Sequence, residues 1–397
     1  MPIRVLMFGW ELPPCNSGGL GVACYGLSQA LVQSDVDVTF VLPKKVPVRA
    51  DFLRLVFADL SGFDWPNFSP YLNINGTPLS DSQVSDLISL VHQYSLKAAA
   101  IAKKHHCDLI HAHDWLCFPA GIAASQATGV PLVSHVHATE YDRSGGASID
   151  PMVYALEKQG MDQADAVIAV SNFTKNLLAK YYLTPPEKVN VVHNGINPDD
   201  FTPEDLESNP LSALKRAGFK IVLYVGRLSL QKGPDYFIKA ARRVLDFAPQ
   251  TVFILVGSGD MEGQLINMTA GLGLSDKVLF AGFLRGQLHK QAFQAADLFV
   301  MPSVSEPFGI TALEAVAHGT PAIISKQSGV SETLSHVLKV DFWDVDEMAN
   351  QILSVLKYNS LHTSLKTNGH QEVKKVSWAA AAAKTIEIYK KILSAKK

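Results

Sequence analysis

The chain has 397 residues, 47% of them hydrophobic, and its 35 Lys plus Arg nearly balance 37 Asp plus Glu, for a net charge of −2. A chain of this length is too long to fold around a single hydrophobic core, so we expect two domains. The charge balance gives no electrostatic reason to expect a nucleic-acid-binding protein. No apolar run approaches the roughly 18 residues that span a bilayer, and the four cysteines lack metal-ligand spacing. We therefore expect a soluble, cytoplasmic protein with reduced cysteines.

Short apolar strands alternate with helical patterns along the whole chain. In the first half the predicted strands are Ile3–Phe8, Val36–Leu42, Phe52–Phe57, Leu109–His111, Pro131–Val136, Ala166–Val170 and Val189–Val192. In the second half they are Ile221–Val225, Val252–Val256, Val278–Phe280, Leu298–Met301 and Ala322–Ser325. Such alternation is typical of α/β proteins with parallel, doubly wound sheets. An amphipathic helix is predicted at the end, over Trp378–Leu393.

A cluster of turn-forming residues divides the pattern into two halves. Asn194-Gly195, Asn197-Pro-Asp-Asp200 and Pro203 follow one another there. We expect an N-terminal Rossmann-like domain over 1–195, a second over 203–375, and a terminal helical segment over 376–397. Two such domains joined by a short hinge would leave an inter-domain cleft at the carboxyl ends of their strands.

The loop after the first predicted strand carries adjacent glycines, Gly18 and Gly19, at the start of a helix. Glycines at a helix N-terminus let the backbone approach a phosphate group. The loop is neither the G-x-G-x-x-G dinucleotide fingerprint nor a P-loop, since no Gly-Lys-Ser/Thr follows. The pattern therefore weakens the NAD and ATP alternatives, but glycine-rich turns of this kind occur in many Rossmann folds.

Two cations follow the strand Ile221–Val225 in a glycine-flanked loop. Arg227 and Lys232 stand five residues apart, between Gly226 and Gly233. Such a pair can hold a diphosphate from two sides. The alternative is that both are ordinary surface charges.

A third strand-loop-helix unit combines a carboxylate with a helix start. The strand Leu298–Met301 leads to Glu306, and a helix is predicted from Phe308 to His318, closed by Gly319. Its first backbone N–H groups, on Phe308, Gly309 and Ile310, would suit an anion. A ligand with both phosphate and hydroxyl groups, such as a sugar nucleotide, would satisfy these amides and Glu306 together. The alternative is a Pro-Phe-Gly turn beside a solvated glutamate.

Histidines gather at two predicted strand ends. His135 and His137 precede a charged, glycine-rich loop, and His111 and His113 precede Asp114. His135 and His137 alternate onto one face of the strand, where one could be buried and hydrogen-bonded, although a charged loop at a strand end favours a functional role. His111 and His113 with Asp114 could be metal ligands. Metal ligation would need a further cluster with a recognised spacing, so no metal site is expected.

Together these motifs resemble those of retaining GT-B glycosyltransferases of family 4, the relatives of bacterial glycogen and starch synthases. The combination of Glu306-x7-Glu314 with Arg227-x4-Lys232 is more specific than either part. The matching segments are Gly18-Gly19-Leu20-Gly21, His111-Ala-His-Asp114-Trp115, His137, Asn194-Gly195, Gly226-Arg227, Lys232-Gly233, Val256-Gly257-Ser-Gly259, Gly282-Phe283, Glu306-Pro-Phe-Gly-Ile-Thr311 and Glu314.

The resemblance implies a role for each of these positions. Four would act on the reacting sugar and its leaving phosphate: Glu306, His137, Arg227 and Lys232. The donor-binding set would be Gly18, Gly19, Arg227, Lys232, Gly257, Gly282, Phe283, Phe308, Gly309, Ile310, Thr311 and Glu314. Within it, Glu314 would take the ribose hydroxyls and the backbone at Gly282-Phe283 would meet the nucleobase. The acceptor-side residues would be Asp114, Glu140, Asp142 and Arg143. The terminal helix would pack back on the first domain.

The implied reaction moves a hexose, with glucose favoured, from a nucleoside-diphosphate sugar to a hydroxyl acceptor with retention. The donor is a co-substrate, and no cofactor or metal is implied. An α-glucan is one acceptor considered, but Asn16 and Ser17 stand where glycogen synthases often have a lysine. Aromatics at 63, 65, 68 and 71 could stack on sugars or pin their own loop. Peripheral membrane contact is left open. The alternatives are a sugar-nucleotide epimerase and a non-catalytic sugar-nucleotide-binding protein.

Overall fold

The computed structural model describes residues 2–15, 18–48, 50–60, 81–146, 148–197, 200–201, 209 and 211–396. The aromatic loop residues Phe63, Trp65, Phe68 and Tyr71 lie outside this part of the chain, as do three positions of the turn cluster, 198, 199 and 203. The chain forms two compact units. The first contains Met1–Tyr141, Gly146–Gly195 and Ser377–Lys397, and the second contains Asp142–Gly145 and Ile196–Val376.

The first unit is built on a parallel sheet with the order β3-β2-β1-β4-β5-β6-β7. Its strands are β1 (Arg4–Phe8), β2 (Asp37–Leu42), β3 (Arg54–Phe57), β4 (Leu109–His113), β5 (Leu132–Val136), β6 (Ala166–Ala169) and β7 (Val189–Val191). The central strands are buried on both faces, as expected for a parallel sheet covered by helices; β4 and β5 are mostly apolar but include the buried polar residues His111, His113, Ser134 and His135.

The second unit repeats this plan with the order β10-β9-β8-β11-β12-β13. Its strands are β8 (Lys220–Val225), β9 (Thr251–Val256), β10 (Val278–Gly282), β11 (Leu298–Met301), β12 (Ala322–Ser325) and β13 (Leu338–Val340). All pairs in both sheets are parallel. In each sheet the chain first adds strands on one side of its first strand and then crosses to the other side, as in the Rossmann fold. The reversal lies between β1 and β4 in the first sheet and between β8 and β11 in the second. The predicted α/β class with two Rossmann-like units is confirmed.

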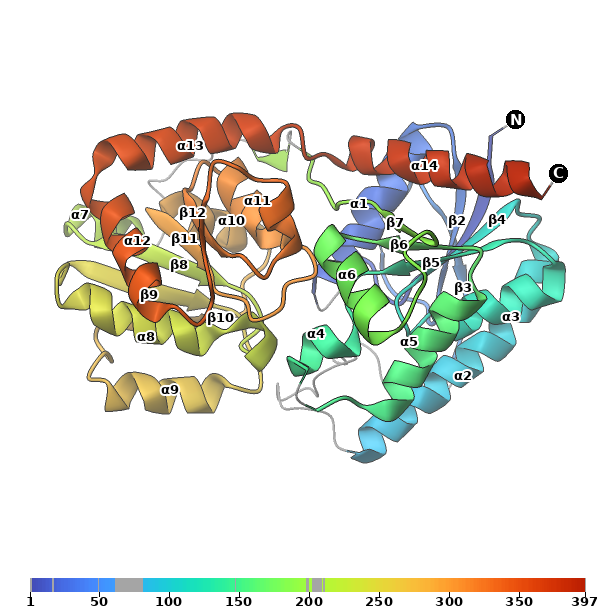
Figure 1. Ribbon diagram of the computed structural model, residues 1–397, viewed down its shortest axis with the longest axis horizontal. Helices are drawn as coiled ribbons and strands as arrows, with labels where there is room; N and C mark the ends of the chain where they lie inside the picture. Colours follow the sequence, from blue (N-terminus) through green and yellow to red (C-terminus); the bar gives the residue numbers. More distant parts are fainter. Residues whose placement is uncertain are drawn as a thin grey trace. The chain divides into compact units, whose positions relative to one another are not determined.

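Helices cover the sheets (Figure 1). In the first unit they are α1 (Gly19–Gln33), α2 (Asp81–Lys104), α3 (Phe118–Thr128), α5 (Pro151–Gln163), α6 (Asn172–Tyr181) and α14 (Trp378–Ala395). In the second they are α7 (Ser212–Arg216), α8 (Pro234–Leu245), α9 (Glu262–Gly271), α10 (Gly286–Ala295), α11 (Ile310–Ala317), α12 (Val345–Lys357) and α13 (Asn359–Val373). The short helix α4 (Glu140–Ser144) is divided between the two units.

Some predicted boundaries differ from the structure. The helix predicted from Phe308 begins at Ile310, because Gly309 has φ 111°, a left-handed conformation that cannot lie inside a helix. The edge strand β13 was not predicted, since its three residues include Lys339 and give too short a pattern. Strand β4 continues to His113, because two buried histidines take apolar positions.

The terminal helix α14 packs on α1 in the first unit (Figure 1). Ser377 caps it, accepting a hydrogen bond from the backbone N–H of Ala380 at 3.2 Å. Two glycines make room for its first residues. A Cβ at Gly26 would lie 2.3 Å from the Trp378 ring, and one at Gly195 would lie 2.3 Å from the Ser377 carbonyl carbon. Helix α14 therefore docks through close contacts that no larger residue allows.

We predict that Gly26→Ala destabilises the first unit by roughly 1–3 kcal/mol, because the added methyl group overlaps the buried Trp378 ring. Denaturant unfolding measures this change. The control is Gly263→Ala in α9, where a Cβ meets nothing within 4 Å. Since alanine favours helix over glycine by about 1 kcal/mol, this control should be neutral or stabilising. Equal midpoints for Gly26→Ala and the parent chain would contradict the docking contact.

Candidate functional site

The chemistry-bearing residues of each unit follow the strands at which its strand order reverses. In such sheets, ligands bind outside the carboxyl ends of these strands. In the first unit Gly18 follows β1 and Asp114 follows β4, and in the second Arg227 follows β8 and Glu306 follows β11. Sequence reasoning singled out all four positions.

An ion pair joins two of these loops in the second unit. The ammonium group of Lys232 lies 2.8 and 2.7 Å from the two carboxylate oxygens of Glu306. The hydroxyl group of Ser303 donates to Glu306 Oε2 at 3.0 Å. The Glu306 side chain is 8% exposed and that of Lys232 is 25% exposed. A positive and a negative charge are thus fixed at one place beside the sheet. Ser303 was not predicted, because a lone serine after a strand carries no signal.

Glycines let these loops approach one another closely. Gly233 has φ 62°, and a Cβ there would lie 2.2 Å from the carbonyl oxygen of Pro302. Gly257 has φ 141°, and its Cβ would lie 1.9 Å from the carbonyl oxygen of Gly226. These contacts hold Lys232 beside the loop after β11 and Arg227 beside the loop after β9. Both glycines were among the residues that matched the family.

The helix N-terminus beside Glu306 is formed by Gly309, Ile310 and Thr311. Gly309 is the N-cap, and no side chain caps this end. Phe308 is 3% exposed and lies before the helix, so its predicted place in the first turn is wrong. Because the helix starts two residues later, the amides that its first turn leaves available begin at Ile310.

Glu314 lies in α11, partly buried, with no side-chain hydrogen-bond partner among the described residues. Burial raises the pKa of its carboxyl group to about 7. A carboxyl group in this position can accept hydrogen bonds from the hydroxyl groups of a ligand. The predicted ribose contact stays a prediction.

The turn after β10 presents an exposed aromatic ring. Gly282 has φ 67° and its carbonyl oxygen accepts from the backbone N–H of Gly257 at 2.8 Å. Phe283 is 53% exposed, and the Arg285 guanidinium lies 4.8 Å from its ring centroid. An exposed ring with a cation on one face offers a surface on which a planar base can stack. Its contact with a nucleobase stays a prediction.

In the first unit, α1 begins at Gly19 with Gly18 as its N-cap. Among the residues that the structure describes, nothing lies within 4 Å of the place that a Cβ at Gly19 would take. The buried carboxylate of Glu11 accepts from the backbone N–H of Gly21 at 3.2 Å. An anion at this end would therefore share the helix start with Glu11, a residue that the sequence prediction left out.

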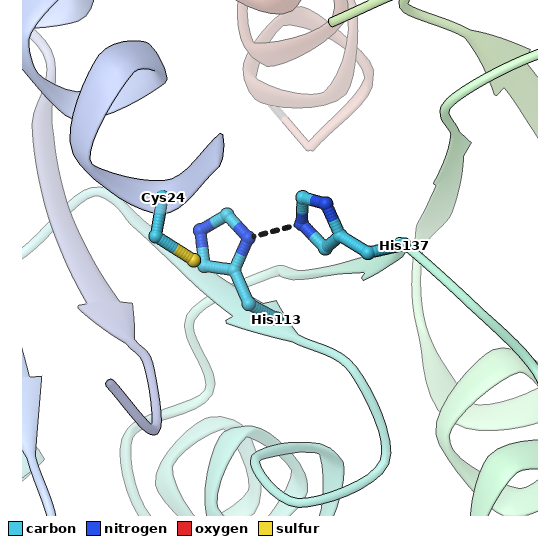
Figure 2. Close-up of side chains that lie close together, drawn as sticks. All are labelled: Cys24, His113 and His137. Carbon is cyan, nitrogen blue, oxygen red and sulfur yellow. Dashed lines mark hydrogen bonds between the residues drawn. The ribbon is translucent and has the colours of Figure 1, made fainter. Parts of the chain in front are cut away.

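Four histidines form one cluster at the carboxyl ends of β4 and β5. Within each strand the two rings are stacked, with centroids 4.4 Å apart for His111 and His113 and 4.2 Å apart for His135 and His137. His113 Nδ1 and His137 Nε2 lie at hydrogen-bonding distance, 2.9 Å (Figure 2). His111, His113 and His135 are at most 1% exposed, and His137 is partly buried.

Burial keeps the cluster neutral, because water no longer solvates a charged ring. It lowers the pKa of His111 and of His137 to about 3, and the pKa of His113 and His135 well below its ordinary value. Neighbouring histidines lower the pKa of His111, His113 and His135 further. Sequence reasoning placed His135 and His137 on one strand face but could not show that the four rings meet.

Two groups in the cluster are close enough to suggest metal ligands: Cys24, His113 and His137, and His111, His113 and His135. Figure 2 shows Cys24 on α1 beside the His113 ring. In the second group the rings of His111 and His113 are stacked, 20° from parallel. A bound metal lies near the plane of each imidazole, so stacked rings do not direct their nitrogens to one point. In the first group, the imidazole–imidazole hydrogen bond already occupies His113 Nδ1 and His137 Nε2.

Asp114 fastens the cluster to the strand end. It has φ 59°, a left-handed conformation that Asp tolerates, and it is 2% exposed. Its Oδ1 accepts from the backbone N–H of His137 at 2.6 Å and from that of Ala138 at 3.4 Å. The predicted acceptor-side aspartate thus positions the backbone of His137, and its contact with an acceptor stays a prediction.

The other predicted acceptor-side residues lie in α4. Within the second unit, the Ser305 hydroxyl donates to Asp142 Oδ1 at 2.6 Å, one residue before Glu306. Glu140 Oε1 accepts from the backbone N–H of Asp150 at 3.3 Å. Arg143 lies in the last turn of α4. The structure thus brings Asp142 to the loop after β11, whereas Glu140 is engaged with the segment that precedes α5.

Comparison with known proteins finds two family models, one matching each half of the chain. The family model "Glycosyltransferase Family 4" matches residues 17–200, and "Glycosyl transferases group 1" matches residues 207–372. An uncharacterized glycosyltransferase from Methanocaldococcus jannaschii is 32% identical, over 98% of both chains. The chain belongs to the glycosyltransferases.

Two further relatives place this glycosyltransferase among the GT-B enzymes. A glycogen synthase from Mycobacterium tuberculosis is 29% identical over 84% of this chain and 80% of its own. The crystal structure of Anabaena HepE in complex with UDP and glucose superimposes with a TM-score of 0.75 at 20% identity, over 98% of this chain and all of that one. The predicted membership of the glycosyltransferases and the predicted GT-B fold are confirmed. Among the described residues, no helix is long and apolar enough to cross a membrane.

We predict that acid destabilises the first unit through the histidine cluster. Unfolded histidines take up protons near pH 6.5, whereas the folded rings do so only at much lower pH. Stability conferred by the neutral rings is therefore lost as the pH falls below about 6.5, by about 1.4 kcal/mol per pH unit for each ring that titrates. Denaturant unfolding between about pH 7 and pH 5 tests this slope. A flat dependence would contradict the buried, neutral cluster.

For Glu314, in the second unit, we expect the opposite pH dependence, with stability falling as the pH rises. Its folded pKa of about 7 lies above the unfolded value of 4.5, so stability is lost as the pH rises through this window. We expect Glu314→Gln to be more stable than the parent by roughly 1–3 kcal/mol near pH 8 and similar near pH 5. The control is Glu347→Gln, which makes the same substitution at an exposed position of α12. A constant difference across the pH range would contradict the raised pKa.

Proposed function

We propose that this glycosyltransferase moves a hexose, with glucose as the favoured sugar, from a nucleoside diphosphate to a hydroxyl acceptor with retention of anomeric configuration. The observation that carries the proposal is the ion pair between Lys232 and Glu306 beside the N-terminus of α11. Cation, carboxylate and helix amides match the diphosphate and hydroxyl groups of a sugar nucleotide.

The chemistry of the leaving group explains why these groups are needed. Breaking the sugar–phosphate bond leaves a negatively charged nucleoside diphosphate. Lys232, Arg227 and the amides at the start of α11 would stabilise this charge. In the free protein Glu306 holds the Lys232 ammonium in place. When the donor binds, the diphosphate would share Lys232, and Glu306 could then accept hydrogen bonds from the transferred sugar.

The first unit supplies the remaining parts of the proposal. His137 would stand beside the reacting end of the sugar, held by the backbone hydrogen bond to Asp114. Its lowered pKa keeps it neutral, which suits a transition state in which positive charge develops on the sugar. Gly18 and Gly19 would complete the phosphate contacts. Retention follows the family resemblance, in which the leaving phosphate helps to deprotonate the acceptor on the same face.

Relatives guide the choice of substrates. HepE is described in complex with UDP and glucose, and another relative is named glycogen synthase. UDP-glucose is therefore the first donor to test, followed by ADP-glucose, with and without a maltooligosaccharide acceptor. A thermal-shift screen of nucleotide sugars, followed by an acceptor array with the best donor, would identify both substrates.

Two other functions remain testable alternatives. A sugar-nucleotide epimerase would convert the donor alone, which NMR of a donor-only incubation detects. A non-catalytic binding protein would bind the donor tightly without turnover for any acceptor. Transfer of the sugar to an acceptor excludes both.

We predict that Lys232→Ala and Glu306→Ala each lower the transfer rate by roughly 10²–10³-fold, because each removes a charge contact to the reacting donor. The control is Lys326→Ala, which breaks an exposed ion pair with Asp341 in the same unit. Initial rates of sugar transfer at saturating donor measure the effect. Full transfer rates in both site variants would show that the site is assigned to the wrong residues.

A further inference from the structure

The terminal helix reaches the histidine cluster through one hydroxyl group. Tyr389, in α14, is fully buried, and its hydroxyl lies 2.5 Å from His111 Nδ1. The other nitrogen of His111, Nε2, lies 3.2 Å from His135 Nδ1. A chain of hydrogen bonds thus runs from α14 through β4 to β5.

The direction of this chain follows from the donors and acceptors available. In the part of the chain that the structure describes, His111 Nδ1 is the only hydrogen-bond partner of the Tyr389 hydroxyl. Burial raises the pKa of Tyr389, so its oxygen keeps its proton and must donate it. His111 Nδ1 therefore accepts, and the proton of this neutral ring is on Nε2. That Nε2–H donates to His135 Nδ1, which places the proton of His135 on its own Nε2.

The opposite direction is less favourable. It would leave the Tyr389 proton without an acceptor and the Nε2 lone pair of His135 without a donor. In the direction from Tyr389 to His135, only the Nε2–H of His135 stays unpaired among the described residues. One buried unpaired group costs less than two. The hydroxyl of Tyr389 therefore selects a single tautomer for both histidines.

We propose that Tyr389 is a positioning residue for sugar transfer, which fixes the tautomers of His111 and His135 and so orders the neutral imidazole stack behind His137. This inference rests on the proposed function, in which His137 stands beside the reacting sugar. The His135 ring stacks on that of His137 with centroids 4.2 Å apart and planes 23° from parallel.

Without the Tyr389 hydroxyl, nothing among the described residues would select between the two neutral forms of His111. The proton of the His111 ring could then move from Nε2 to Nδ1, and His135 Nδ1 would lose its hydrogen-bond donor. His135 would become a mixture of tautomers, and the ring on which His137 stacks would no longer be fixed. Donor binding in the second unit does not use this contact, so we expect a change in kcat rather than in the KM for the donor.

The test compares Tyr389→Phe with Tyr94→Phe in the full-length chain. Tyr94 is a matched control, because it is also fully buried in the first unit but donates to the backbone carbonyl oxygens of Val41 at 2.8 Å and Gly9 at 3.2 Å. With ¹⁵N-labelled histidine, NMR reports which ring nitrogen carries the proton. We expect Nε2–H forms for His111 and His135 in the parent and in Tyr94→Phe, and altered nitrogen shifts for both in Tyr389→Phe.

The kinetic measurement uses sugar transfer from the donor that the screen identifies. We expect Tyr389→Phe to lower kcat roughly tenfold, with the donor KM changed less than about twofold, and Tyr94→Phe to match the parent. An Nδ1–H form of His111 in the parent, or unchanged shifts in Tyr389→Phe, would overturn the tautomer assignment. Altered shifts with an unchanged kcat would overturn the positioning role. A parent chain that transfers no sugar would refute the proposed function, while NMR would still decide the tautomer assignment.

Discussion

The ion pair between Lys232 and Glu306 is the interaction around which the second unit is arranged. It requires two loops from different strands to meet, and the close backbone approach at Gly233 allows this. A partly buried ammonium next to a buried carboxylate is costly to desolvate, and such pairs are weak contributors to stability. The pair is therefore better explained by chemistry: it holds two opposite charges beside the start of α11, where the proposed sugar nucleotide would bind.

The first unit has the same type of sheet but carries different side chains at the carboxyl ends of its strands. At the corresponding place it holds four neutral imidazoles rather than a charged pair, and burial keeps them neutral. Asp114 ties the backbone at His137 to the end of β4, and Tyr389 ties the rings to α14. One unit thus carries a charged pair and the other a set of neutral rings, the two kinds of group that the proposed transfer reaction would use.

Sequence patterns predicted the fold well because parallel strands are buried on both faces and read as continuous apolar runs. The loop residues Arg227, Lys232 and Glu306 could be found because they follow such runs directly. Other features depend on distances that no local pattern encodes. The contacts of His111 with Tyr389 and with His135 join residues that lie far apart in the sequence and that only the folded chain brings together. The start of α11 was missed because the left-handed backbone at Gly309 is not apparent from its neighbours.

The docking of α14 has a consequence for biosynthesis. The unit that opens the chain is discontinuous: its last helix, with the Trp378 ring held against Gly26, is translated after every residue of the other unit. Until α14 has been made, α1 lacks the helix that packs on it, and His111 Nδ1 lacks its contact with the Tyr389 hydroxyl. The unit that begins the chain is thus completed last, and a chain that ended before α14 would lack a helix that packs on α1, near the start of the sequence.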